Sequence, residues 1–162
     1  MSGCPGHFLP AMKNLRSFLS LAAALCAAGA NQLSAAAAPR EIEITANDQM
    51  KFSVAAIEAK AGEQLKVTLK NIGTLPKEAM GHNWVLLKPG TDLNAFAMAA
   101  MTAKDSDYVP AAHKYKVVAF IKVLGPKQTA DATFSLSAPG EYSFICSFPG
   151  HYMLMKGTIT VK

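Results

Sequence analysis

Near its C-terminus the chain places a thiol, an imidazole and a thioether in one short loop between two strand-like runs. The loop reads Cys146-Ser-Phe-Pro-Gly-His151-Tyr-Met-Leu-Met155, and the runs that flank it are Tyr142–Ile145 and Gly157–Val161. Because strands hold the ends of a connecting loop in place, a loop of this length can turn three side chains toward one point. The rest of the fold must therefore be arranged around this strand, loop and strand.

The residue types in this loop are ligands for a soft metal. A Cys thiolate is a strong soft ligand, imidazole suits copper, and a thioether is a weak soft ligand. Two His and one Cys in a trigonal set, with a long axial Met, form blue-copper electron-transfer centres. The loop supplies one His, and Met80-Gly-His82-Asn-Trp84 supplies a second one upstream. The sequence therefore predicts a copper site that includes His82, Cys146, His151 and Met155.

Each of these residues alone also has another interpretation. A Cys that ends an apolar strand is often a small buried hydrophobic residue. Cys and His can form a nucleophile and its base, but that chemistry needs a third orienting group beside a substrate cleft. A copper enzyme would need a second, open metal site, and the only other His after the N-terminal segment is His113. Zinc binds His and Cys well, but copper stands higher in the affinity order of divalent metals, so we expect copper.

The first part of the chain has the layout of an export signal. A basic start at Met12–Arg16 is followed by an apolar run, Phe18–Ala30, and by small residues as far as Ala38. This is the order of a secretory signal peptide, and the run is too short for a membrane-spanning helix. We expect 1–36 to be an upstream extension and signal peptide, with the mature chain starting between about 31 and 39. Met12 is a better initiator than Met1.

The cysteines and the charged residues argue against lipidation, an internal disulfide and nucleic-acid binding. Lipidation at Cys26 is disfavoured because Leu25, rather than a small residue, precedes it. Only Cys146 remains after residue 36, so no internal disulfide is expected, and metal ligation gives the lone thiol a role. Loss of Lys13 and Arg16 with the signal leaves 14 Lys and Arg against 11 Asp and Glu. The chain has no basic run with interleaved aromatic residues, which gives nucleic-acid binding little support.

Eight short segments with strand character follow, separated by turn residues. Polar and apolar residues alternate most clearly in Gln64–Lys70, as in a half-buried strand. The other segments are Glu41–Ala46, Met50–Val54, His82–Leu87, Lys116–Leu124, Ala130–Leu136, Tyr142–Cys146 and Lys156–Lys162. Between Thr91 and Tyr115, apolar residues recur at helical spacing, which predicts one short helix and a loop outside the strands. Without βαβ alternation, the pattern predicts an all-β fold, a single Greek-key β-sandwich domain over 37–162 with Trp84 in its interior.

Over about Glu41–Lys162 the chain resembles the azurins, blue-copper proteins of the bacterial periplasm with the cupredoxin fold. The motifs that carry this resemblance are Asn47-Asp-Gln-Met50, Leu75-Pro-Lys77, Met80-Gly-His-Asn-Trp-Val-Leu86, and the ligand loop followed by Lys156-Gly-Thr158. The resemblance implies a cupredoxin-like sandwich with an external helical flap. It implies one copper ion with His82, Cys146 and His151 as equatorial ligands. Met155 would be the weak axial ligand, and the carbonyl of Gly81 would lie on the opposite side.

The resemblance also implies a function and a place in the cell. It implies a monomeric periplasmic electron carrier, not an enzyme, that cycles copper between Cu(II) and Cu(I). The partners would be c-type cytochromes or a periplasmic reductase, docking on an apolar patch around an exposed His151. The patch residues implied are Met50, Leu75, Met80, Phe148, Pro149, Gly150 and Leu154. The alternative is a periplasmic copper storage or delivery protein, with the same ligands and no electron-shuttle role.

Two departures from the azurin pattern bear on stability and on pH dependence. Azurins usually have a disulfide between the first strand and the start of the third, and here Arg40 and Glu63 stand at the matching positions. A surface ion pair of little energetic value could take its place. Azurins often have a His eleven residues before the first copper His, where this chain has Asn71. The resemblance further implies that Asn83 ties the two ligand-bearing loops together and that the backbone N–H of Phe148 donates to the Cys146 sulfur.

Overall fold

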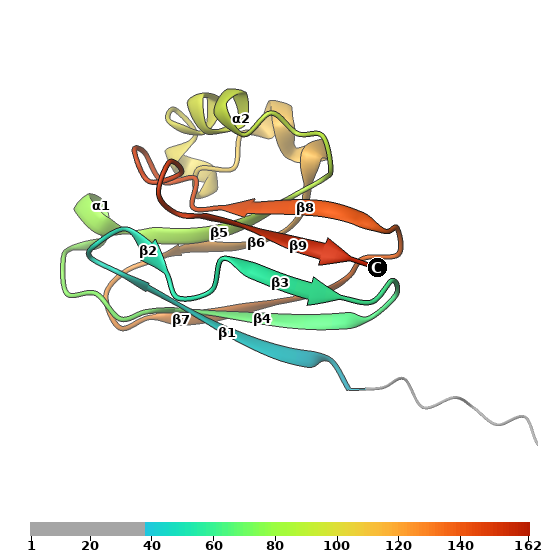
Figure 1. Cartoon of the computed structure of the whole chain (residues 1–162). Helices are drawn as coiled ribbons and strands as arrows, with labels where there is room; N and C mark the ends of the chain where they lie inside the picture. The colour runs from blue at the N-terminus through green and yellow to red at the C-terminus, as the bar shows by residue number, and fades with distance from the viewer. Residues whose placement is uncertain (1–37) are drawn as a thin grey trace, which may run out of the picture. The chain divides into compact units, whose positions relative to one another are not determined.

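The computed structural model describes residues 38–162, so the expected signal peptide at 1–36 lies outside the described residues. Two β-sheets lie face to face (Figure 1). The first sheet has the order β2-β1-β4-β7, made of β1 (Arg40–Asn47), β2 (Lys51–Phe52), β4 (Gln64–Asn71) and β7 (Thr129–Ser135). The second has the order β3-β9-β8-β5-β6, made of β3 (Ala56–Ala59), β9 (Lys156–Val161), β8 (Gly140–Ile145), β5 (His82–Leu87) and β6 (Val117–Leu124). The predicted all-β Greek-key sandwich is confirmed.

The space between the sheets is filled by the alternating apolar residues of the strands. Leu65, Val67 and Leu69 on β4 are all fully buried, as the alternation predicts. Trp84 is also fully buried, and its ring lies 5.8 Å from that of Phe134 and 5.5 Å from that of Phe144. Burying a large apolar side chain stabilises a fold by about 1.5–3 kcal/mol, so these residues supply much of the stability of the sandwich.

A flap of short helices covers the outer face of the second sheet (Figure 1). It contains α2 (Leu93–Ala100), η1 (Lys104–Ser106) and η2 (Ala111–Lys116), and a further short helix, α1 (Lys77–Met80), precedes β5. The side chain of Asp92 caps α2 by accepting from the backbone N–H of Ala95 at 3.0 Å. Val85 on β5 packs outward against Phe96 of the flap, while Trp84 packs inward. Strand β5 is therefore buried on both faces.

The structure differs from the sequence prediction in one strand and three short helices. Strand β3 was not predicted; it pairs in parallel with β9, with Ile57 opposite Ile159. Only Ile57 and Ala59 of its four residues are buried, so the run is too short for its alternation to stand out. Residues 111–115 were expected to lie in a loop and Lys116 to begin a strand, but 111–116 form the 3₁₀ helix η2. The short helices α1 and η1 were not predicted either. With β3, the described residues form nine strands rather than about eight.

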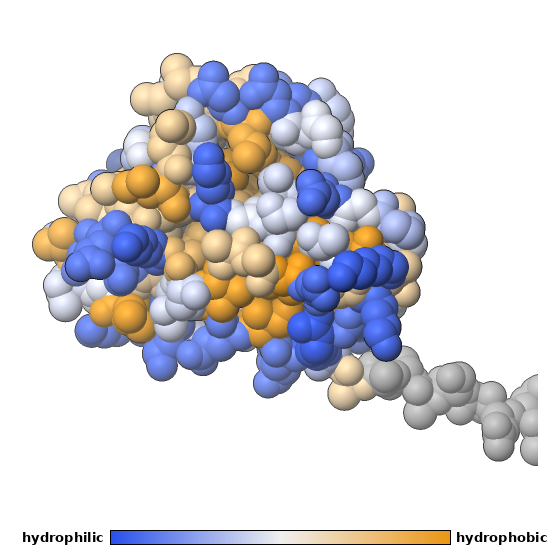
Figure 2. Space-filling model, in the orientation of Figure 1, coloured by the Kyte–Doolittle hydropathy of each residue, from blue (hydrophilic) through white to orange (hydrophobic). Residues whose placement is uncertain are grey.

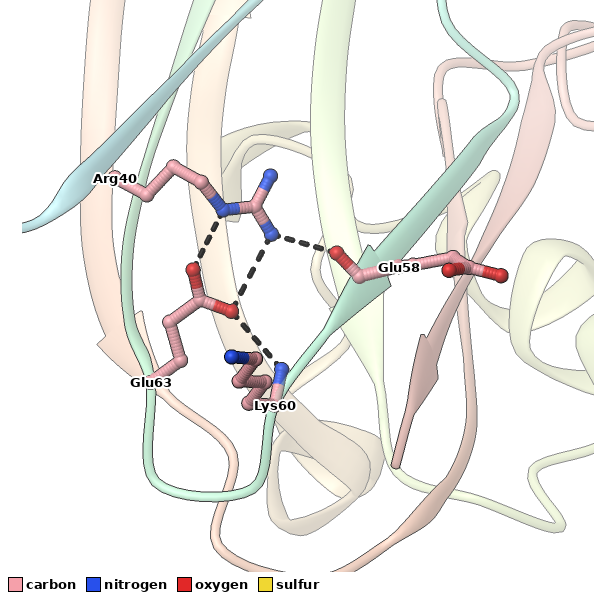
Figure 3. A network of polar contacts seen from close by, with 4 residues as sticks. All are labelled: Arg40, Glu58, Lys60 and Glu63. Atoms are coloured by element: carbon pink, nitrogen blue, oxygen red, sulfur yellow. Dashed lines mark hydrogen bonds and ion pairs between the residues drawn. The ribbon is translucent and has the colours of Figure 1, made fainter.

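A polar network joins the two sheets at the start of β1 (Figure 3). The Arg40 Nε donates to a carboxylate oxygen of Glu63 at 2.6 Å, and Arg40 Nη2 donates to the backbone carbonyl of Glu58 at 2.6 Å. Glu63 also accepts from the backbone N–H of Lys60 at 2.9 Å. The ion pair expected between Arg40 and Glu63 is therefore present. The hydrogen bond from Arg40 to the Glu58 carbonyl also links β1 of one sheet to β3 of the other.

The surface of the sandwich mixes hydrophilic and hydrophobic side chains. Figure 2 shows one face, on which hydrophobic residues are visible among hydrophilic ones. The most exposed large apolar side chains include Tyr115, Leu154, Met153 and Met98. Single exposed apolar residues are normal in proteins, so only a grouping of them would indicate a contact surface. Within 38–162, no helix has the length and hydropathy needed to cross a bilayer.

Candidate metal centre

Three side chains that can bind a metal converge beside the ends of β5 and β8. His82 is the first residue of β5, Cys146 directly follows β8, and His151 lies in the loop before β9. One ring nitrogen of each His and the Cys146 Sγ all lie within 4.8 Å of one another. The exposed fractions of these side chains are 0% for His82 and Cys146 and 3% for His151. In the described part of the chain this is the one group of His, Cys, Asp or Glu side chains arranged to hold an ion.

The loop from Cys146 to Met155 folds back on itself through its own backbone. Gly150 has a φ of +82°, a conformation that favours glycine, and turns the chain toward His151. The N–H of His151 donates to the Phe148 carbonyl at 3.1 Å, and the N–H of Met155 donates to the His151 carbonyl at 2.9 Å. The N–H of Cys146 donates to the Met155 carbonyl at 2.9 Å. Met155 is fully buried in the same apolar cluster as Cys146, and this last hydrogen bond joins the backbones of the two residues.

Gly81, the residue before His82, is required by close packing. A Cβ at this position would lie 2.6 Å from the carbonyl oxygen of Lys77 and 2.6 Å from a methyl carbon of Val123. It would also lie 3.2 Å from the ring of Phe148 in the ligand loop. Any side chain here would therefore clash with α1 and β6 and would also press on the Phe148 ring of the ligand loop.

Asn83 and Ser147 fasten the two ligand-bearing segments to each other. The Asn83 side-chain amide donates to Ser147 Oγ at 2.8 Å, and the backbone N–H of Ser147 donates to Asn83 Oδ1 at 2.7 Å. The tie expected from Asn83 is therefore present. The same amide donates to the Asp107 carbonyl, and Ser147 Oγ donates to the Tyr108 carbonyl, both at 2.7 Å.

Asp107 and Tyr108 extend this tie into the flap, and sequence reasoning did not identify them. Both residues have left-handed backbone conformations, with φ of 53° and 59°. Such conformations in residues other than glycine cost energy and persist where surrounding contacts hold them. No motif in the sequence marks this pair, because its role depends on the two backbone carbonyls that accept hydrogen bonds from Asn83 and Ser147.

Tyr152 connects the ligand loop to the flap helix α2. Its hydroxyl donates to Asn94 Oδ1 at 2.6 Å. Its ring packs against the cluster of flap and sheet residues that includes Val85 and Phe96. Sequence reasoning did not identify this contact either, since a Tyr beside a ligand carries no signal of its distant partner. The residue next to His151 is thus held from outside the loop.

Burial keeps the three converging side chains uncharged. It raises the pKa of the Cys146 thiol to about 12, an effect that backbone N–H groups of Asn83 and Phe148 reduce only in part. Burial, and next the charge of His82, lower the pKa of His151 to about 4. Burial also lowers the pKa of His82, which the Asn47 carbonyl and the Asp48 carboxylate partly oppose. At neutral pH the site therefore holds a thiol and imidazoles without charge.

These donor atoms fit a copper ion. Both ring nitrogens of His82 are buried without a hydrogen-bond partner of good geometry, and a buried polar atom left unpaired is costly. The Cys146 Sγ lies 3.6 Å from Nδ1 of His151, so the two donors face one another. Imidazole nitrogens with a thiolate and a thioether are the donor set that copper takes in proteins.

The structure corrects one expectation about His151. It was expected to be exposed, but its side chain is 3% exposed. Phe148 accounts for part of this burial, because its ring centre lies 4.8 Å from that of His151 and it is itself 7% exposed. Among the other expected patch residues, Leu75 and Leu154 are exposed, at 43% and 63%. Gly150 is also exposed, and Met50, Met80 and Pro149 are half-buried.

Comparisons with known proteins agree with this fold and site. Residues 39–162 match the family model described as copper binding proteins, plastocyanin/azurin family. An azurin of Pseudomonas fluorescens biotype C is 40% identical over 127 residues, which cover 75% of this chain and 98% of the relative. The solved azurin Az-iso2 of Methylomonas sp. strain J superposes with a TM-score of 0.68 at 31% identity, covering 77% of this chain and 99% of that one. Auracyanin A, a blue copper protein of Chloroflexus aurantiacus, gives 0.68 at 30% identity, covering 77% and 100%. The chain therefore belongs to the plastocyanin/azurin family of copper-binding proteins.

Proposed function

We propose that this protein binds one copper ion and carries single electrons between redox proteins. His82, Cys146 and His151 would be the equatorial ligands. Met155 would be the weak axial ligand, with the Gly81 carbonyl on the opposite side. The observation that carries the proposal is the convergence of one thiol and two imidazoles within 4.8 Å at a buried position. Bound copper supplies a reversible Cu(II)/Cu(I) couple in such a site.

The surrounding residues hold these donors in one arrangement. The Asn83–Ser147 hydrogen bonds fix the two ligand-bearing segments relative to each other. The hydrogen bonds from Cys146 to Met155 and from Met155 to His151 fix the loop. Contacts that orient ligands in this way also tune the properties of the site. Because the donors need to move little when the charge changes, the arrangement suits electron transfer better than substrate chemistry.

We propose the surface over the ligand loop as the docking face for redox partners such as c-type cytochromes or a periplasmic reductase. This His151 patch consists of Met50, Leu75, Met80, Phe148, Pro149, Gly150 and Leu154. Leu75 and Leu154 are 43% and 63% exposed, and the resemblance to azurins assigns both to this patch, where exposed apolar residues would mark a contact site. His151 is 3% exposed, so electrons would pass through a thin cover rather than a bare imidazole. A small apolar face suits brief redox encounters.

The proposed place of action is the periplasm. The basic start at Met12–Arg16, the apolar run Phe18–Ala30 and the small residues after it support export and removal of 1–36. The domain at 37–162 would then act there as a monomer. Residues 38–162 contain a single Cys, which is buried, so this domain would form no internal disulfide after export. Metal binding would give that thiol its role.

Electron self-exchange tests this proposal. We expect a reversible one-electron couple by voltammetry and fast self-exchange by NMR line broadening in mixtures of the two redox states. Leu154→Lys should slow self-exchange severalfold or more, because like charges would face each other across the contact. Ala61→Lys, an exposed position in the turn between β3 and β4, adds the same charge elsewhere and should change little.

The outcomes separate the candidate functions. Copper binding without a reversible couple would indicate a storage or delivery protein instead of an electron carrier. A reversible couple with self-exchange that Leu154→Lys leaves unaltered would place the electron exit away from the His151 patch.

A further inference from the structure

The positive charge of the domain is concentrated in one segment of the chain. Residues 37–162 hold 14 Lys and Arg against 11 Asp and Glu. The stretch from Tyr108 to Ala130 contains four lysines, at 114, 116, 122 and 127, and no acidic residue. The rest of the domain then carries ten basic and eleven acidic residues, close to balance. This separation within a small domain creates a local positive field that can attract an acidic partner.

The structure places this segment on one flank of the sandwich. It forms η2 and then β6, which is an edge strand of the second sheet. Phe120 and Lys122 are two residues apart on β6, are both exposed, and so point to the same side of the strand. Phe120 and Lys114 line one shallow hollow of about 210 Å³.

Two aromatic side chains are exposed among these lysines. Tyr115 is 67% exposed and Phe120 is 41% exposed. The Lys116 ammonium lies 5.7 Å from the centre of the Tyr115 ring, within range of a cation–π contact. Aromatic residues are enriched at protein contact surfaces. We use the name lysine face for this group of neighbouring residues on η2 and β6, which are Lys114, Tyr115, Lys116, Phe120 and Lys122.

The acidic residues that flank the segment do not cancel this charge. Asp107 is the one acidic residue that lines the hollow with Lys114, and its carboxylate accepts a hydrogen bond from the backbone N–H of Val123 at 3.0 Å. Asp131 belongs to β7 of the other sheet. Three lysines of the lysine face therefore stand against the single carboxylate of Asp107, which leaves this flank positive overall.

Two observations relate the lysine face to the metal centre. On β6, Phe120 is paired with Val85 and Leu124 with His82, so the face borders the strand that begins with a ligand. A second hollow of about 220 Å³ shares Asp107 with the first and is lined by Phe148. The Phe148 ring lies 4.8 Å from the His151 ring. A partner on this flank would thus lie against β6, which pairs with the strand that begins at His82.

We propose that the lysine face is a second docking surface, distinct from the His151 patch, and that it takes a redox protein whose contact surface is acidic. The proposal rests on the proposed electron-carrier function. Carboxylates of the partner would face Lys114, Lys116 and Lys122, and Phe120 would provide the apolar contact at the centre. Such charge complementarity raises the association rate and selects partners of the right sign.

Association with c-type cytochromes of opposite net charge tests the proposal. One probe is a c-type cytochrome of strongly negative net charge, and the other is one of strongly positive net charge. For the acidic probe, the second-order electron-transfer rate at low salt should fall as ionic strength rises, because salt screens surface charge. The combined variant Lys114→Gln, Lys116→Gln and Lys122→Gln should lower that rate by about tenfold and flatten its salt dependence. NMR titration of the copper-free protein should show the same loss of binding without any redox reaction.

A matched variant separates the lysine face from net charge alone. Lys60→Gln, Lys66→Gln and Lys162→Gln removes three lysines outside the basic segment. We expect it to keep most of the rate with the acidic cytochrome. Equal loss in both triple variants would show that only total charge matters and would overturn the proposal. NMR shifts confined to the His151 patch, or binding to phosphatidylglycerol vesicles in place of the cytochrome, would overturn it as well.

Self-exchange of the same variants distinguishes this proposal from the proposed function. The lysine-face variant should keep the self-exchange rate of the unmodified protein, because two copies would meet at the His151 patch. If the unmodified protein shows no self-exchange and no reversible couple, the electron-carrier function itself fails. If self-exchange is normal while the acidic cytochrome reacts equally fast with every variant, only the lysine face is wrong.

Discussion

At the scale of single residues, the metal centre is a set of donors kept neutral by burial. The Cys146 thiol has its pKa raised to about 12, and the His151 imidazole has its pKa lowered to about 4. Burial lowers the pKa of His82 in the same direction. The copper-free site at neutral pH therefore holds one proton on sulfur and none in excess on the imidazoles. A metal ion must displace that proton when the thiolate binds it.

Proton release on metal binding follows from these pKa values. Loading with Cu(II) at pH 7.5 should release about one proton per ion, which comes from Cys146. Calorimetric titrations in buffers of different ionisation enthalpy measure this number. Cys146→Ser should release close to none, since a serine hydroxyl keeps its proton. Release of two or more protons by the unmodified protein would mean that a histidine is charged in the copper-free state.

Asn71 predicts a redox potential that changes little with pH. Its buried amide donates to the Leu124 carbonyl at 3.2 Å and accepts from the Gly73 N–H at 2.9 Å. Leu124 is paired with His82, so the amide is linked to a ligand-bearing strand but cannot take up a proton. We expect a nearly flat potential between about pH 5 and pH 8, where histidine titrates.

Voltammetry across that range, repeated on Asn71→His, tests this expectation. The substituted protein should show a potential that falls as pH rises. A sigmoidal fall in the unmodified protein, persisting in His113→Gln, would contradict the role given to Asn71.

Much of the candidate site could be predicted at this scale because its residues lie in two short motifs. Cys146, His151 and Met155 share a loop, and His82 stands in a recognisable second segment. The burial of His151 could not be predicted, because it depends on how Phe148 folds across it. The contact of Tyr152 with Asn94 joins residues 58 positions apart, and neither position carries a motif.

At the scale of elements, the ligand loop is braced by the flap as well as by its own backbone. The hydrogen bond from Tyr152 to Asn94 fastens the residue after His151 to α2. The amides of Leu154 and Met155 both donate to the His151 carbonyl, at 3.1 and 2.9 Å. Removing the hydrogen bond of Tyr152 should therefore weaken the hydrogen bonds of these two amides.

Tyr152→Phe removes this brace while keeping the ring in the apolar cluster. A single hydrogen bond contributes about 0.5–1.5 kcal/mol, so amide hydrogen exchange at Leu154 and Met155 should quicken severalfold in the copper-free protein. Tyr115→Phe, in which the hydroxyl lies outside the loop, serves as the matched control. Unchanged exchange in Tyr152→Phe would show that the loop needs no support from α2.

The Arg40–Glu63 network makes stability depend on acid pH. The Arg40 hydrogen bond, followed by the Lys60 N–H, lowers the pKa of Glu63 below its usual 4.5. A lowered pKa in the folded state stabilises the fold above the usual value, and this stabilisation is lost as pH falls through the lowered one. Glu63→Gln should therefore lower the Tm modestly at pH 7.

Thermal melts over a pH series measure this difference. The gap in Tm between Glu63→Gln and the unmodified protein should shrink below pH 4.5 and vanish in stronger acid. Glu43→Gln, at an exposed position on β1, removes the same charge outside the network. An equal and pH-independent effect of both substitutions would show that the ion pair does not act in the folded state.

Strands and helices could be predicted where the burial of their residues follows the pattern of apolar residues in the sequence. Strand β4 alternates and is buried on alternate residues. Strand β5 is continuously apolar after Asn83, because the flap covers its outer face. Strand β3 and the short helices α1, η1 and η2 were missed, since three to six residues carry too few positions for any period to show. The position of β3 depends on its parallel pairing with β9, a strand about a hundred residues away in the sequence.

At the scale of the whole molecule, the polar network that joins the two sheets and the candidate metal centre lie at different ends of the sandwich. The network of Arg40 and Glu63 joins the sheets at the start of β1 and just before the start of β4. The other end of β4 is Asn71, which is bonded to Leu124, the residue paired with His82. The two proposed docking surfaces differ in character, since the His151 patch is apolar and the lysine face is positively charged. Composition predicts only a mild net charge, and the fold is needed to show that its excess lies on one flank.

The visible absorption spectrum of the copper-loaded protein tests the central claim most directly. A Cu(II) ion held by the Cys146 thiolate and two imidazoles, with Met155 as the weak axial ligand, should give an intense blue colour from thiolate-to-copper charge transfer. Cys146→Ser should abolish the band, and Met155→Gln should keep a blue site at a lower potential. A copper-loaded unmodified protein without colour would contradict the account.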